Sequence, residues 1–158
     1  MRHKRITKRK IEPDLKYQNP HIGKFINYVM KCGKKSLAEK IVYGALDLVS
    51  QKTNVEPLIT FEKALRNASP DIVVKARRIG GANYQIPVPA EEERKFVLAT
   101  RWLIEAAREK KGKSMIEKLA DEIMAAAKNE GSAIAKKEGL HKLAEANKAF
   151  AYFARFIK

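Results

Sequence analysis

Apolar side chains recur three and four positions apart through most of this chain, which is the spacing of one face of an amphipathic helix. The segments with this pattern are residues 22–30, 37–48, 58–65, 96–106, 115–123 and 140–147. Residues 71–89 depart from it, with β-branched and basic residues before a glycine-rich turn and prolines after it. The sequence therefore predicts a mainly α fold, a bundle of about six helices with one protruding β-hairpin arm and a basic N-terminal extension.

Turn and capping residues place the ends of these helices. Gly33 is expected to end the first helix. Ser36 with Glu39, and Ser114 with Glu117, have the spacing of a capping box, in which a hydroxyl and a carboxylate satisfy free amides at a helix start. The expected buried face of the helix after Ser36 is Leu37, Ile41, Ala45 and Leu48.

The exceptional segment is predicted to be a β-ribbon, with strands at 71–79 and 84–89 around a turn at 80–83. Pro87 and Pro89 lack the amide hydrogen that a ladder needs, so the second strand must be an edge strand. One face of the ribbon could pack on the helices while the other binds a partner, because successive side chains point to opposite faces. The residues expected on the packing face are Ile72, Val74 and Ala76.

The ribbon also carries side chains suited to nucleic acid. Cations on a strand can reach phosphates or stack on bases, and an aromatic ring can stack as well. The residues of this kind are Lys75, Arg77, Arg78, Tyr84 and Gln85. We predict that the two arginines bind RNA.

Net charge indicates the class of partner. The chain has 33 Lys and Arg against 18 Asp and Glu, a formal net charge of +15, which favours a phosphate-rich partner. Residues 1–35 hold eleven of the cations and two of the acids. We expect a single domain over 1–158, with a basic arm at 1–18 that binds nucleic acid and a helical body at 19–158. The cations of the arm are Arg2, Lys4, Arg5, Lys8, Arg9 and Lys10.

Two loop-to-helix junctions, residues 33–36 and 112–114, share a glycine, lysine and serine. Free amides, the positive end of the helix dipole and an ammonium group together favour a bound phosphate. A surface helix can also begin with lysine and serine without binding anything, but two such junctions in so basic a chain favour contacts with an RNA backbone. The residues predicted to make them are Lys34, Lys35, Lys113 and Ser114.

Catalytic and metal-binding patterns are missing from the sequence. The three histidines are scattered, and Cys32 has no neighbouring histidine. The Gly-Lys-Ser string at 112–114 lacks the earlier glycine of a nucleotide-binding P-loop, because Ala107 stands there in a predicted helix. We therefore expect no enzymatic activity, metal or cofactor.

The cysteine count and the lack of long apolar runs bear on location. A single cysteine excludes an internal disulfide and suits a reducing compartment, and no apolar run has the length of a membrane span. We expect a cytoplasmic protein without a membrane partner and not a homo-oligomer. At the C-terminal end, Phe150 is assigned to the core, whereas Tyr152, Phe153 and Phe156 could pack inside or reach a partner.

Several strings along the chain occur together in one known family. They are KFIN at 24–27, GKKS at 33–36, IVY at 41–43, ARRIGGANYQIP at 76–87, RWL at 101–103, KSM at 113–115 and AEANKAF at 144–150. With these strings in this order from about residue 13 to 150, the chain resembles the bacterial-type family of small-subunit ribosomal protein seven. The strings at 76–87 and 144–150 are the most specific.

The resemblance implies a helical bundle with a β-ribbon that binds the 3′ domain of small-subunit ribosomal RNA and nucleates assembly of the subunit head. It also implies a place at the exit site, near the departing tRNA and the messenger, with ribosomal proteins nine and eleven as neighbours. By position, the ribosomal RNA contacts would be the arm, Lys34, Lys35, Arg77, Arg78, Lys113 and Ser114. The residues facing the exit-site tRNA would be Gly80, Gly81, Asn83, Tyr84, Lys142 and Lys148.

Two other functions are compatible with parts of the pattern. A basic ribbon with prolines can enter a DNA minor groove, as in architectural DNA-binding proteins. An RNA-modifying or nucleotide-hydrolysing enzyme is the second alternative, and the missing P-loop glycine argues against it. A ribosome within an organelle is an alternative setting to the cytoplasm.

Overall fold

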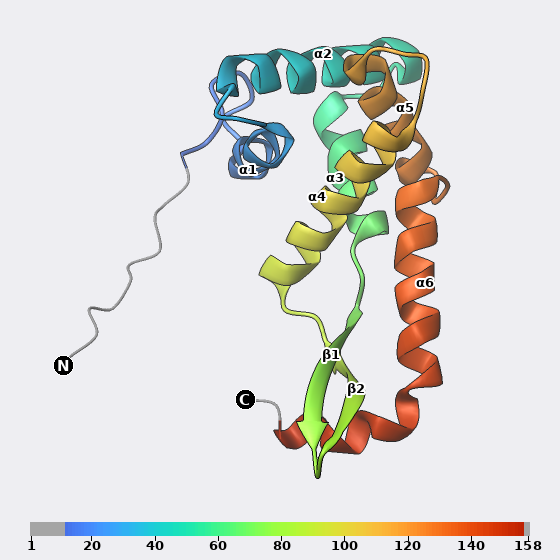
Figure 1. Ribbon diagram of the computed structural model, residues 1–158. Helices are drawn as coiled ribbons and strands as arrows, with labels where there is room; N and C mark the ends of the chain where they lie inside the picture. Colours follow the sequence, from blue (N-terminus) through green and yellow to red (C-terminus); the bar gives the residue numbers. More distant parts are fainter. Residues whose placement is uncertain (1–11, 157–158) are drawn as a thin grey trace, which may run out of the picture.

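The computed structural model describes residues 12–156, which form a helical body with a ribbon extending from one end (Figure 1). The α-helices are α1 (Pro20–Val29), α2 (Lys35–Thr53), α3 (Pro57–Ala68), α4 (Glu92–Glu109), α5 (Met115–Ala127) and α6 (Ser132–Ala146). The strands are β1 (Ile72–Ile79) and β2 (Ala82–Pro89), and a 3-10 helix, η1 (Lys148–Phe156), follows α6. The predicted mainly α fold with one hairpin is confirmed.

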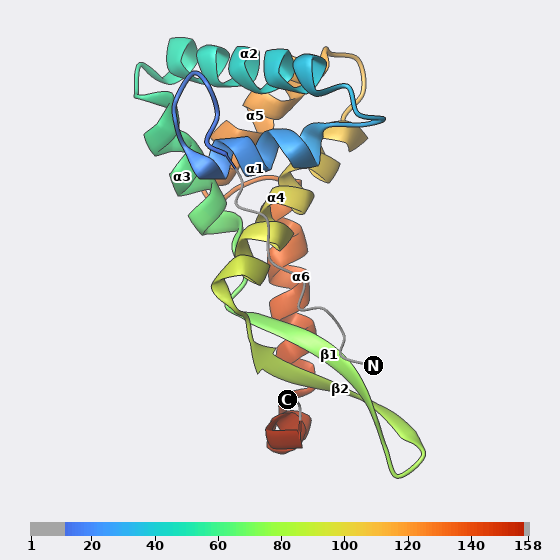
Figure 2. The ribbon, with the colours of Figure 1, turned by 90° about the vertical axis from the view of Figure 1, so that its left-hand side faces the viewer.

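The ribbon does not stand alone. Helix α6 leaves the body and runs beside the ribbon, and η1 turns across the ribbon's far half (Figures 1 and 2). Within residues 12–156, no helix has both the length and the apolar character needed to cross a membrane.

The body has one apolar core, to which α1 to α5 and the start of α6 contribute. Helix α5 packs against α2, α3 and α4. Phe25 of α1 and Phe61 of α3 are fully buried and meet edge to face, with ring centroids 5.0 Å apart. Burial of such apolar faces supplies most of the stability of helices in proteins. We call this cluster the body core.

The buried face of α2 differs from the predicted one by a rotation of about one residue. Leu37 is 53% exposed, and the buried residues are Ala38, Val42, Ala45, Leu46 and Val49. Gly44 explains the difference, because a Cβ at this position would meet the Ile116 side chain at 3.2 Å. Helix α2 therefore turns its small residues toward α5, and the two helices approach closely.

Helix α1 ends earlier than predicted. It stops at Val29 instead of continuing to Gly33, and Met30 already has an extended ψ of 135°. Cys32 and Gly33 follow with positive φ angles of 52° and 72°, which no helix accepts. Cys32 therefore lies exposed in the loop between α1 and α2, and not at a helix end.

The ribbon turns more tightly than the sequence suggested. Only Gly80 and Gly81 form the turn, with φ angles of 56° and 91°, and both angles favour glycine. Ala82 and Asn83, which were expected in the turn, instead pair with Ile79 and Arg78. Both strands of this two-stranded sheet are edges, which agrees with the prolines of β2.

The packing face of the ribbon is opposite to the predicted one. Val73 is buried together with Ile86 and Val88, whereas Ile72 is 41% exposed and Ala76 is also exposed. The antiparallel register decides this, because Val73 lies opposite Val88 and partners project from the same face. We call Val73, Ile86 and Val88 the ribbon core.

Part of the predicted N-terminal arm is fixed to the body. The carboxylate of Asp14 is buried and accepts hydrogen bonds from the amides of Tyr17 and Asn19, both at 2.8 Å, and from the Tyr43 hydroxyl at 3.3 Å. Gly23 allows the chain to cross α1, since a Cβ there would lie 2.8 Å from a backbone oxygen. The ordered body thus begins before residue 19, the predicted boundary.

The direction of α6 depends on a buried carboxylate. Glu122 of α5 is fully buried, accepts a hydrogen bond from the amide of Ala133 at 3.0 Å and pairs with Lys110. Gly131 has a φ of 97°, and a Cβ there would meet Glu122 Oε1 at 2.9 Å. Glu122 therefore fixes the start of the helix that reaches the ribbon.

Candidate nucleic-acid interface

The junction between α1 and α2 presents two lysines at an open helix start. Lys34 and Lys35 are exposed, and no described side chain caps the helix. Within residues 12–156, no carboxylate pairs with either ammonium group. Two ammonium groups next to the positive end of a helix dipole form a site that favours a phosphate.

The capping box predicted for Ser36 and Glu39 is wrong. Helix α2 begins at Lys35, so Ser36 lies inside the first turn instead of in the capping position. The N-cap is Lys34, so Ser36 lies two positions beyond it. This offset leaves the start of α2 without a side-chain cap.

The junction between α4 and α5 has a similar sequence and a different environment. Ser114 caps α5 as predicted, because its hydroxyl oxygen accepts from the Glu117 amide at 3.3 Å and its hydroxyl lies 2.9 Å from a Glu117 carboxylate oxygen. Lys113 pairs with Asp121 at 2.9 Å, and Asp121 also pairs with Lys52 at 3.0 Å. The hydrogen bonds from Lys113 and Lys52 hold the pKa of Asp121 below its ordinary value. Lys113 is thus already partnered.

The cations of the ribbon are divided between its two faces. Lys75 and Arg77 lie opposite Ile86 and Tyr84, on the face that holds the ribbon core. Arg78 lies opposite Asn83 on the other face. All three cations are exposed. The arginine pair predicted to act together therefore points in two directions.

The residues expected to face a tRNA do not share one environment. Gly80, Gly81 and Asn83 are exposed at the ribbon tip. Tyr84 is half-buried, and its ring lies 5.1 Å from that of Phe150 and 5.7 Å from that of Phe153. Two further residues expected to face the tRNA, Lys142 of α6 and Lys148 at the start of η1, are exposed.

Comparison with known proteins identifies the family of this chain. A family model described as "Ribosomal protein S7p/S5e" matches residues 1–148. The chain belongs to this family. Three relatives, each named small ribosomal subunit protein uS7, are similar to it over nearly their full length. They come from Pelotomaculum thermopropionicum (56% identical, 94% of this chain and 95% of the relative), Marinobacter nauticus (52%, 93% and 94%) and Thermotoga maritima (51%, 97% and 99%).

Membership of the S7p/S5e family decides between the alternatives left by the sequence. The chain is a structural ribosomal protein and not an enzyme. The three relatives are bacterial, so they give no support to an organellar setting. The predicted arm contacts from Arg2 to Lys10 lie outside the described residues.

A mixed face of aromatic and cationic side chains on α1 and α4 was not predicted. The Arg101 guanidinium lies 5.9 Å from the centre of the Tyr28 ring, and the Lys24 ammonium lies 5.8 Å from the centre of the Phe96 ring. Arginine and aromatic planes are the groups on which RNA bases stack. The signal in the sequence was the polar side of each amphipathic helix, where Lys24 and Tyr28 are four residues apart and so lie on one face.

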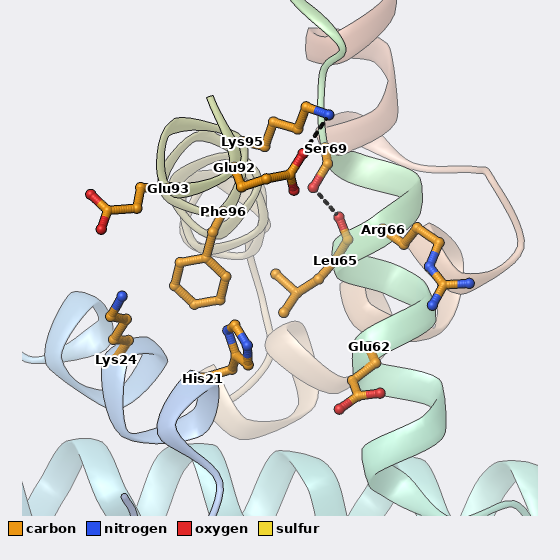
Figure 3. Close-up of a pocket in the computed structure, with 10 residues that line it drawn as sticks. All are labelled: His21, Lys24, Glu62, Leu65, Arg66, Ser69, Glu92, Glu93, Lys95 and Phe96. Carbon is orange, nitrogen blue, oxygen red and sulfur yellow. Dashed lines mark hydrogen bonds and ion pairs between the residues drawn. The ribbon is translucent and has the colours of Figure 1, made fainter. Parts of the chain in front are cut away.

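A cleft of about 460 Å³ lies next to this face, between α1, α3 and α4 (Figure 3). His21 and Phe96 face each other in it, with ring centroids 5.0 Å apart. Its rim mixes cations with the carboxylates of Glu62, Glu92 and Glu93, and Glu92 pairs with Lys95 at 2.9 Å. Because carboxylates repel phosphate, this cleft is a weaker candidate for RNA than the α1–α2 junction.

Proposed function

We propose that the chain is a structural constituent of the small ribosomal subunit that binds ribosomal RNA through its exposed cations. The observation that carries this proposal is the open start of α2, where Lys34 and Lys35 lie without carboxylate partners among the described residues. The net charge of +15 and the names of the relatives support it. The further predicted contacts are the arm, Lys75, Arg77, Arg78, Lys113 and Ser114.

We also propose that binding to the 3′ domain of the RNA nucleates assembly of the subunit head. A body with a single apolar core and cations at separate junctions can hold several RNA segments at fixed distances. That is the property a nucleating protein needs, since each bound segment reduces the freedom of the next. Ribosomal proteins nine and eleven are the proposed protein neighbours, and the cytoplasm is the proposed location.

The ribbon is proposed to lie at the exit site, close to the departing tRNA and the messenger. It extends away from the body, so it can reach a ligand that the body does not touch (Figure 2). Arg78, Asn83 and the exposed glycine turn are at its far end, and Lys142 and Lys148 lie on the elements beside it. These positions suit contacts with a second RNA.

Competition binding tests the proposal. The full-length protein is bound to a labelled RNA containing the 3′ domain, and three unlabelled competitors are compared. They are the same domain, the 5′ domain of the same RNA and duplex DNA of equal length. We expect the 3′ domain to compete at least about a hundredfold better than the DNA, as specific complexes typically exceed non-specific ones by about 10³ or more. Equal competition by DNA would favour the architectural DNA-binding alternative, and equal competition by the 5′ domain would contradict the head-assembly role.

A further inference from the structure

The ribbon contacts the rest of the molecule at its base, along its buried face and in its far half. At its base, the Asp71 amide donates to His141 Nε2 at 3.2 Å, and the Asp71 carboxylate lies 3.7 Å from the Lys95 ammonium. These contacts tie the base to α6 and α4. In the far half of the ribbon, the Tyr84 ring contacts the Phe150 and Phe153 rings of η1.

The contact between Tyr84 and η1 is aromatic and has defined geometry. The Tyr84 ring meets Phe150 at 61° with centroids 5.1 Å apart, and Phe153 at 37° with centroids 5.7 Å apart. Aromatic pairs at these separations attract each other beyond the area they bury. Phe150, Phe153, Leu140 and Leu98 also pack against the ribbon core. We call Tyr84, Phe150 and Phe153 the aromatic clasp.

A two-stranded ribbon needs such support. An isolated hairpin is marginally stable in water, and its direction relative to a body depends on what it packs against. The ribbon core has three buried residues, all in the half nearer the body or the middle of the strands. Without the clasp, the half of the ribbon that ends at Gly80 and Gly81 would pivot about those residues.

Segment η1 is built to present its rings to the ribbon. Helix α6 ends at Ala146, and the side-chain amide of the following Asn147 donates to the Leu143 carbonyl at 2.8 Å. The chain then turns and continues as a 3-10 helix, in which residues three apart lie on the same side. Phe150 and Phe153 are three apart and both reach Tyr84.

We propose that Phe150 and Phe153 are positioning residues for the ribbon, and that they set its inclination to the body by clasping Tyr84. The consequence for function rests on the proposed exit-site role of the ribbon. Tyr84 and its cross-strand partner Arg77 lie on the face of the ribbon that is turned to η1. Arg78 and its partner Asn83 lie on the opposite face. The family model ends at residue 148, so both phenylalanines lie beyond the part of the chain that it matches.

The test measures the ribbon's direction in the free full-length protein. In a Cys32→Ser background, cysteines at the exposed positions Asn83 and Glu138 carry spin labels, and the distribution of distances between them is recorded. We expect one narrow distribution for the parent and a clearly broader one for Phe150→Ala/Phe153→Ala. Leu143→Ala is the control, because Leu143 is 44% exposed near the end of α6 and lies outside the apolar cluster of the ribbon, and it should leave the distribution narrow. Among single variants at Phe153, Phe153→Ala should broaden the distribution, whereas Phe153→Tyr, which keeps the ring, should leave it narrow.

Amide exchange gives an independent measurement. Exchange of the Tyr84 and Ile86 amides should become about tenfold to a hundredfold faster in the double variant, since two aromatic pairs are lost and each is worth about a tenfold change at most. The body amides should not change. If the double variant does not fold, Tyr84→Leu breaks the same contacts from the side of the ribbon. A narrow distance distribution together with unchanged amide exchange in these variants would contradict the proposal that the aromatic clasp positions the ribbon.

A functional measurement separates the two proposals. Small subunits carrying the double variant are tested for protection of the exit-site tRNA and for binding of the 3′ domain. We expect weaker tRNA protection and ribosomal RNA affinity within about twofold of the parent, because the clasp is remote from the α1–α2 junction. A broadened distribution with unchanged tRNA protection would contradict the exit-site role while supporting the clasp.

Discussion

The two loop-to-helix junctions of this protein share a glycine, lysine and serine, yet only one of them is open. At the start of α2, Lys34 and Lys35 face solvent, and no described side chain caps the helix. At the start of α5, the serine caps the helix and Lys113 pairs with Asp121. The difference arises because Ser36 lies two positions past the N-cap of α2, and because Asp121 of α5 pairs with Lys113.

This comparison shows that a phosphate-binding pattern requires free charge as well as free amides. The α5 junction already satisfies its cation and one of its amides within the protein. A phosphate that binds there must compete with Asp121 for Lys113, whereas no carboxylate among residues 12–156 pairs with Lys34 or Lys35. We therefore propose that the α2 junction is the stronger RNA contact.

The largest expected effect concerns RNA affinity. Replacing Lys34 and Lys35 with alanine should flatten the plot of log affinity against log salt by about 1.4 to 1.8, because each lost phosphate contact removes about 0.7 to 0.9 of the slope. Lys113→Ala should remove less than about 0.7. Affinities for the 3′-domain RNA measured at several salt concentrations give these slopes. A larger change for Lys113 than for the Lys34/Lys35 pair would reverse the comparison.

An intermediate effect is expected on stability. Ser114→Ala removes a helix cap and should lower the free energy of unfolding by about 1 kcal/mol. Ser36→Ala is the matched control, and it should change that free energy by less than about 0.5 kcal/mol, since Ser36 caps nothing and alanine is the better helix former. Urea denaturation of the parent, Ser114→Ala and Ser36→Ala measures both changes in the free energy of unfolding. Similar losses at the two serines would mean that both junctions are capped.

The smallest effect is a pH dependence of the α5 junction. Because the hydrogen bonds from Lys113 and Lys52 lower the pKa of Asp121 in the folded protein, the ionised carboxylate stabilises the fold above the ordinary pKa of about 4. This contribution is lost as the pH falls through the lowered folded value. It should be at most about 1 kcal/mol, since solvent screens the exposed lysines.

Asp121→Asn makes the α5 junction resemble the α2 junction. The difference in unfolding free energy between the parent and this variant should be full at pH 7 and should vanish below the lowered pKa. Denaturation curves of the two proteins from pH 7 to pH 3 measure this difference in unfolding free energy. A difference that persists unchanged at the acid end would show that the pairing with the lysines contributes nothing.

The sequence predicted the elements of the fold well. Helical spacing and the double glycine at 80–81 are local signals, and each marks a helix or the turn of the ribbon, although α6 begins at Ser132, earlier than the spacing indicated. The faces of those elements were predicted less well. Leu37 is exposed because Gly44 lets α2 approach α5 closely, and Val73 is buried because it pairs with Val88. Both facts depend on residues outside the local pattern.

The candidate site shows the same division. The excess of cations, the exposed lysines at the start of α2 and the resemblance to the ribosomal family were available from the chain as a string of residues. The partner of Lys113, the aromatic face of α1 and α4, and the orientation of Tyr84 were not. Each of these involves side chains from separate elements, such as Lys52 and Asp121, which are 69 positions apart.

The sequence by itself determined which segments are helical, where the single ribbon lies, how strongly the chain attracts a polyanion and to which family it belongs. These properties depend on local spacing and on composition, and both are complete before the chain folds. Tertiary structure alone decided that Lys52 joins Lys113 at Asp121 and which face of the ribbon is turned away from η1. The physical reason is that a side chain's partner is set by distance in space, and only packing brings Lys52 to Asp121 or Phe150 to Tyr84.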